Sequence, residues 1–153
     1  MSPRPHTALD PAFREKVSTS FHGQSAMDAW GVRLVRVDPG EVELSFAHRP
    51  DLLQQHGFMH GGVLGAVLDT ACGFASLSLM PAGVGVLTVE YKVNFVAPGR
   101  GDTFRALGRV RKAGRTITLA EAELFGRTGE RERLLATMTA TMMTVTGRDD
   151  VRD

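Results

Sequence analysis

One carboxylate stands alone in a long apolar stretch of this chain. Asp69 is the only acidic or basic side chain between His60 and Glu90. A buried carboxylate without partners costs several kcal/mol or shifts its pKa, so such a residue is paired, placed in a wet cleft, or functional. We therefore take Asp69 as a candidate catalytic residue. The alternative is a structural Asp that is satisfied by hydrogen bonds from neighbouring groups.

The tripeptide His60-Gly61-Gly62 stands where a helix should begin. Glycines there let a ligand approach backbone N–H groups that have no partner inside the helix. With the helix dipole behind them, these groups can stabilise an oxyanion. The alternative is that the two glycines only permit a tight turn from the loop into the helix.

The spacing of the two features limits how they can act together. Asp69 lies eight residues after Gly61, which is about 12 Å of rise along one helix. A reacting carbonyl needs contacts of roughly 3 Å to both groups. If both residues are catalytic, one of them must come from a second subunit, which places the site at a dimer interface.

The elements that must position these residues follow from the apolar pattern. Between His60 and Leu79 the apolar residues occupy nearly every side of a helical wheel, which predicts a helix surrounded by protein. Six β-rich runs accompany it, near residues 32–37, 42–46, 86–96, 103–111, 116–125 and 134–145. One apolar helix covered by six strands favours an α+β fold, with an antiparallel sheet wrapped around one long central helix.

Local signals refine this outline. The alternation of the first run slips at Leu34-Val35, which indicates a bulge or a two-sided strand, and Asp38-Pro39-Gly40 predicts a turn. We expect further turns at Pro98-Gly99, at Ala113-Gly114 and over 126–132. The domain prediction is an N-terminal extension with a short helix (1–24), a main domain (25–146) and a flexible tail (147–153).

Composition excludes several classes of protein. A formal net charge of +1 gives no global field for binding nucleic acid or an anionic membrane. A span over 61–80 is disfavoured because Asp69 lies near its middle. The single cysteine, Cys72, and the lack of a signal-like N-terminus favour the cytoplasm. His56 and His60 have the i, i+4 spacing of zinc ligands, but Gly57 and the missing Glu argue against a metal site.

The site residues together resemble a known family. Gln54, His60-Gly61-Gly62, Asp69 and the run Thr88 to Phe95 before Pro98 are similar to the hotdog acyl-CoA thioesterases of the phenylacetate-pathway (PaaI-like) type, over about residues 34–145. The resemblance implies that the Gly61 N–H polarises the thioester carbonyl and that Asp69 of the facing subunit attacks it or activates water. It further implies that Gln54 and Thr88 orient the reacting groups, with His60 and Gly62 supporting them.

The same resemblance extends to substrate and assembly. It implies that basic residues contact the CoA phosphates, for which the candidates are Arg109, Arg111, Lys112 and Arg115; the alternative is a solvated hairpin tip. The expected substrate is an aryl-, phenylacetyl- or medium-chain acyl-CoA, and the expected assembly is a homotetramer built from catalytic homodimers. No metal or other cofactor is expected. A non-catalytic acyl-CoA-binding protein and an enoyl-CoA hydratase are the alternatives.

Overall fold

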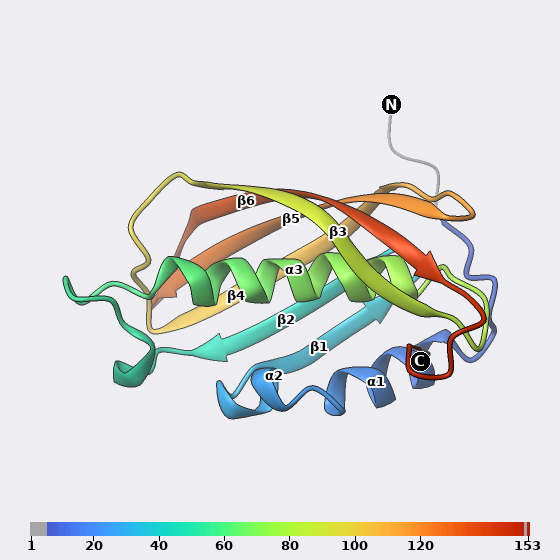
Figure 1. The fold of residues 1–153 in the computed structure, drawn as a ribbon. Helices are drawn as coiled ribbons and strands as arrows, with labels where there is room; N and C mark the ends of the chain where they lie inside the picture. Colours follow the sequence, from blue (N-terminus) through green and yellow to red (C-terminus); the bar gives the residue numbers. More distant parts are fainter. Residues whose placement is uncertain (1–5, 152) are drawn as a thin grey trace.

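A six-stranded antiparallel sheet curves around one long helix in the computed structural model, which describes residues 6–151 and 153 (Figure 1). The strand order is β1-β2-β4-β5-β6-β3, so β1 and β3 form the two edges. This is the arrangement that the apolar pattern predicts. The strands are β1 (Arg33–Asp38), β2 (Glu41–Ala47), β3 (Gly85–Phe95), β4 (Thr103–Lys112), β5 (Ile117–Thr128) and β6 (Arg131–Val145).

Helix α3 (Gly61–Leu77) crosses the concave face of the sheet, and His60 is its N-cap. It packs closely on β4 because Gly108 has no side chain: a Cβ at Gly108 would fall on the backbone carbonyl of Ala71. The predicted helix over 60–79 is therefore confirmed, and its apolar residues are buried against strands from β2 to β6.

The β1–β2 hairpin agrees with its sequence prediction, and the β5–β6 hairpin differs from it. The register of β1 with β2 shifts between Leu34 and Arg36, which confirms the bulge among the two alternatives, and Gly40 turns the chain with a φ of +77°. The turn predicted over 126–132 is too long. Both strands run into that segment, and Gly129, with a φ of +57°, allows a reversal between Thr128 and Arg131.

Two helices precede the sheet. Helix α1 (Phe13–His22) confirms the expected short N-terminal helix, and it buries three apolar residues at helical spacing, Phe13, Val17 and Phe21. Helix α2 (Ser25–Ala29) and the 3₁₀ turn η1 (Pro50–Leu52) were not anticipated. The Phe21 ring lies edge-on to Phe74 of α3, with centroids 5.8 Å apart, so the corner between α1 and α2 lies beside the central helix.

The C-terminal residues lie near the beginning of β3. The backbone N–H of Asp153 donates to the carbonyl of Val84 at 3.2 Å. Among residues 6–151 and 153, none of the helices has the length and hydropathy that crossing a membrane would require.

Candidate active site

Asp69 projects from the middle of α3 toward strand β3. The Thr88 hydroxyl donates to Asp69 Oδ1 at 2.8 Å. The register of β3 with β6 shifts between Thr88 and Glu90, and such a bulge turns the side chain beside it. Asp69 and Thr88, two separate candidates from the sequence, are thus in direct contact.

The surroundings of Asp69 favour its protonated form. Burial raises the pKa of Asp69 above its ordinary value, and the hydrogen bond from Thr88 lowers it in part. Neither an Arg nor a Lys contributes to this shift. A half-buried carboxylate without a cation beside it is a stronger proton acceptor than an exposed one, which suits a general base.

The beginning of α3 holds a backbone N–H without a partner. The imidazole Nδ1 of His60 accepts from the Gly62 N–H at 2.9 Å, which requires Nδ1 to be unprotonated. Among the hydrogen bonds of the described residues, none uses the Gly61 N–H. The cap therefore occupies Gly62 and leaves Gly61 as the open donor at the positive end of the helix.

Both glycines are tightly enclosed. A Cβ on Gly62 would lie 3.0 Å from His60 Nδ1, inside the capping contact. A Cβ on Gly61 would lie 3.2 Å from the edge of the Phe95 ring, at the end of β3. The ring is half-exposed, and Gly61 itself is only partly buried.

Gln54 belongs to the loop that leads into α3. Its side-chain oxygen accepts from the His56 N–H, and its backbone N–H donates to the Phe58 carbonyl at 2.8 Å. The loop is tied to α3 because the His60 N–H donates to Leu52 at 2.9 Å. Gln54 thus lies at the Gly61 end of the helix, apart from the contact between Asp69 and Thr88.

The candidate residues of the chain therefore form two separate groups. Gln54, His60, Gly61 and Gly62 gather at the beginning of α3, and Asp69 with Thr88 lies two turns further along. The eight-residue separation corresponds to about 12 Å of helix, so the structure does not bring the carboxylate to the Gly61 N–H within one chain.

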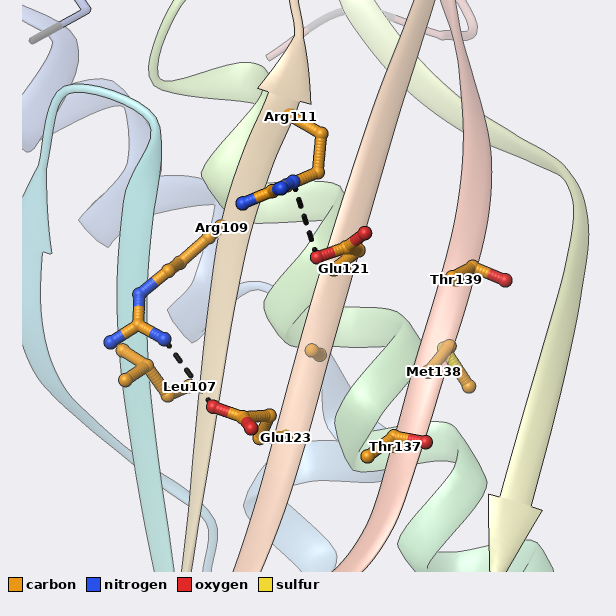
Figure 2. Close-up of a pocket in the computed structure, with 9 residues that line it drawn as sticks. Leu107, Arg109, Arg111, Glu121, Glu123, Thr137, Met138 and Thr139 are labelled. Atoms are coloured by element: carbon orange, nitrogen blue, oxygen red, sulfur yellow. Dashed lines mark hydrogen bonds and ion pairs between the residues drawn. The ribbon is translucent and has the colours of Figure 1, made fainter. Parts of the chain in front are cut away.

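The basic run is divided between paired and unpaired residues. Arg109 lies 2.8 Å from Glu41 and 3.4 Å from Glu123, and Arg111 lies 3.2 Å from Glu121. These pairs stand on the face of the sheet away from α3, beside a hollow lined by threonines of β6 (Figure 2). Within the described part of the chain, Lys112 and Arg115 form no ion pair.

Neither a reactive thiol nor a metal-binding cluster is found among the described residues. Cys72 is fully buried, and burial, together with the charges of Asp69 and Glu121, raises the pKa of its thiol. It is a core residue of α3. Over residues 6–151 and 153, no cluster of three His, Cys, Asp or Glu could hold a metal ion.

One polar residue beside Asp69 was not predicted. Gln24, between α1 and α2, borders a cavity of about 100 Å³ that is also lined by Asp69 and Thr88. No local signal marks an isolated Gln in an N-terminal segment. Its position follows from the packing of Phe21 against Phe74, which periodicity alone does not specify.

Comparison with known proteins identifies a family. The sequence model of the Thioesterase superfamily matches residues 56–132. The medium/long-chain acyl-CoA thioesterase YigI of Escherichia coli K12 is 27% identical over 130 residues, covering 75% of this chain and 82% of that protein. The acyl-coenzyme A thioesterase PaaI of the same organism is 26% identical over 105 residues, covering 68% and 73%.

Solved structures agree with this result. A thioesterase family protein from Silicibacter pomeroyi superposes with a TM-score of 0.87 at 45% identity, covering 88% of this chain and 99% of that one. The E. coli PaaI structure superposes with a TM-score of 0.80 at 21% identity, covering 92% and 98%. At that identity the second match shows the fold alone, which is the hotdog fold.

Proposed function

Because the chain belongs to the Thioesterase superfamily, we propose that it hydrolyses an acyl-CoA thioester to the free acid and CoA. The observation that carries the proposal is the half-buried Asp69, which has a raised pKa and is hydrogen-bonded to Thr88. It lies on the helix whose first N–H, that of Gly61, is open. A proton acceptor and an oxyanion donor are the two groups that thioester hydrolysis requires.

The proposed chemistry begins with the thioester oxygen on the Gly61 N–H. In one route Asp69 takes a proton from water as the water oxygen attacks the carbonyl carbon. In the other, the Asp69 carboxylate attacks directly and water then hydrolyses the mixed anhydride. In both, the tetrahedral intermediate collapses by breaking the C–S bond, and CoA leaves as a thiolate that takes up a proton.

The remaining polar residues are assigned orienting roles. Thr88 holds Asp69 Oδ1 by its hydroxyl, which directs the second carboxylate oxygen. Gln54 shapes the loop before α3 through its contact with the His56 N–H. The cap that His60 places on Gly62 keeps the Gly61 N–H free.

We propose that the catalytic unit is a homodimer formed along β3. That strand pairs with β6 on one side only and ends the sheet. An exposed edge with apolar side chains is a ready template for a second strand. Tyr91 and Lys92 lie midway between Thr88 and Phe95, so antiparallel pairing about that midpoint would set each Thr88 opposite the partner's Phe95. Asp69 would then approach the Gly61 of the partner subunit.

The CoA phosphates are proposed to meet the basic run. Arg109 and Arg111 would have to leave their glutamates to bind a phosphate. Lys112 and Arg115 have no ion pair to break, which makes them the stronger candidates.

We further propose that the protein is cytoplasmic, since one cysteine suits a reducing compartment. We also propose that it forms a homotetramer made of two such dimers.

The acyl group is proposed to be aryl, phenylacetyl or medium-chain. The test offers the purified protein benzoyl-CoA, phenylacetyl-CoA and octanoyl-CoA while free thiol is measured, with its size in solution determined in parallel. We expect turnover of at least one substrate, lowered by about 10²-fold or more in Asp69→Asn. Asp28→Asn, which changes an exposed Asp of α2, is the matched control.

Two results would contradict the proposed hydrolysis of acyl-CoA. A folded protein that releases no thiol from any of the three substrates would defeat the proposal. Tight binding of acyl-CoA without turnover, unchanged in Asp69→Ala, would favour the non-catalytic binding protein instead.

A further inference from the structure

The cavity beside Asp69 has the size and polarity of a water site. Its volume is about 100 Å³, room for about three waters at roughly 30 Å³ each. A buried water needs two to four polar partners. Asp69, Thr70, Thr88 and Gln24 all line the cavity, so polar groups are available on several sides.

The hydrogen bonds already formed leave part of Asp69 open. Thr88 donates to Oδ1, and no group of the described residues donates to Oδ2. A carboxylate that must accept a proton needs one oxygen free for the incoming water. Oδ2 is that oxygen.

Gln24 lines the same cavity, and its carboxamide is unused. Its side chain forms no hydrogen bond with any residue in the described ranges and does not cap α2. Its backbone is held on both sides, since its N–H donates to Phe21 at 3.1 Å and its carbonyl accepts from Asp28 at 3.2 Å. A fixed backbone with a free amide suits a group that orients a small ligand, because an amide both donates and accepts.

We infer that Gln24 positions the water that Asp69 activates. The carboxamide oxygen accepts one hydrogen of this water, which turns the other hydrogen toward Asp69 Oδ2 and the oxygen lone pair toward the thioester carbon. Asp69 then takes the proton as the new C–O bond forms, and Gln24 exchanges no proton. The inference rests on the proposed function and favours its general-base route.

This assignment gives the N-terminal segment a part in the site. Gln24 lies outside residues 56–132, the part matched by the family. It lines the same cavity as Asp69, and the Phe21 ring of its segment packs edge-on against Phe74 of α3. A segment that otherwise serves only to cover the core thus supplies a positioning residue.

Two substitutions test the inference with phenylacetyl-CoA and octanoyl-CoA. Gln24→Met keeps the length of the side chain but cannot bind water, and we expect kcat to fall about tenfold with KM within about twofold. Gln24→Glu sets a second carboxylate beside Asp69, so the acid limb of kcat/KM should move to higher pH. Ser25→Ala and Ser25→Glu alter the exposed neighbouring residue and should change neither quantity.

The outcomes separate this inference from the proposed function. Gln24→Met with the kcat of the wild type, or Gln24→Glu with the pH profile of Ser25→Glu, would overturn it. If Gln24→Met fails to fold, Gln24→Glu decides by its pH profile. Wild-type protein inactive on every substrate defeats the proposed function itself. Active wild type and inactive Asp69→Asn beside fully active Gln24→Met would remove only the role of Gln24.

Discussion

At the scale of single residues, Asp69 couples activity to stability. Burial raises its pKa in the folded protein, so the folded state holds this proton more tightly than the unfolded chain does. Such a group stabilises the fold at low pH, and this contribution is lost as pH rises through the folded pKa. The ionised Asp69 therefore costs stability at neutral pH.

Asp69→Asn should consequently be more stable than the wild type where it is inactive. Thermal unfolding should show equal Tm values for the variant and the wild type near pH 3.8, the ordinary pKa of Asp. Toward neutral pH the Tm of the variant should exceed that of the wild type by a growing amount. Asp28→Asn should show no such widening. A Tm of Asp69→Asn that falls below the wild type at neutral pH would mean that the carboxylate is held by groups other than Thr88.

The hydrogen bond from Thr88 to Asp69 leads to a second prediction for a single residue. This hydrogen bond lowers the pKa of Asp69, so Thr88→Val should raise that pKa further and move the acid limb of kcat/KM to higher pH. We expect kcat to fall about tenfold from the loss of one hydrogen bond. Thr139→Val, on the opposite face of the sheet, is the control. An unchanged acid limb of kcat/KM in Thr88→Val would show that Thr88 does not influence the pKa of Asp69.

Sequence reasoning identified these two residues by different means. Asp69 is visible as an isolated charge in an apolar helix. Thr88 is one of many threonines, and only the family resemblance marks it, because its contact depends on how β3 crosses α3. The glutamates that pair with Arg109 were also hidden, since Glu41 and Glu123 meet it through cross-strand register.

At the scale of elements, the position of α3 depends on one glycine of β4. A Cβ on Gly108 would fall on the carbonyl of Ala71, two residues after Asp69. Gly108→Ala should therefore push the helix from the sheet and cost about 1–3 kcal/mol, read from denaturant unfolding. Gly65→Ala, where a Cβ meets nothing within 4 Å, should keep or raise stability. Equal stability of Gly108→Ala and the wild type would refute the close packing.

The elements themselves were largely predictable because their signals are local. A helix that is apolar all round and strands separated by glycine turns follow from periodicity, and the bulge after Leu34 follows from a slip in alternation. Helix α2 was not predicted because its five residues bury only Met27, which gives no apolar periodicity. The turn after β5 was overextended because polar residues at exposed strand ends resemble a loop in composition.

At the scale of the whole molecule, helix geometry and the sheet edge lead to the same assembly. The rise along α3 separates Gly61 and Asp69 by about 12 Å, and β3 leaves one edge of the sheet unpaired. A twofold axis between Tyr91 and Lys92 would resolve both features at once. If Gly61 and Asp69 are both catalytic, the sequence predicts that a second subunit is needed, but not which sheet edge it would use, because that depends on the strand order.

Mixed dimers test whether each site is shared between chains. Asp69→Asn and Gly61→Val should each be inactive, because the first removes the proton acceptor and the second blocks the open N–H beside Phe95. If Asp69 serves the Gly61 of the partner subunit, a dimer of one chain of each kind contains one intact site and one doubly defective site. Co-expression with two tags and purification through both should therefore recover about half of the wild-type activity per dimer, by the symmetry of a twofold interface.

The inverse pairing supplies the control. A chain carrying both substitutions, purified as a mixed dimer with wild type, should be inactive, since each site then takes one defective residue from the doubly substituted chain. If each site were instead built within one chain, the two results would be exchanged: the first mixed dimer would be inactive and the second would keep about half. Because both mixtures contain the same two substitutions in the same dose, the contrast between them depends only on which chain supplies Asp69 to Gly61.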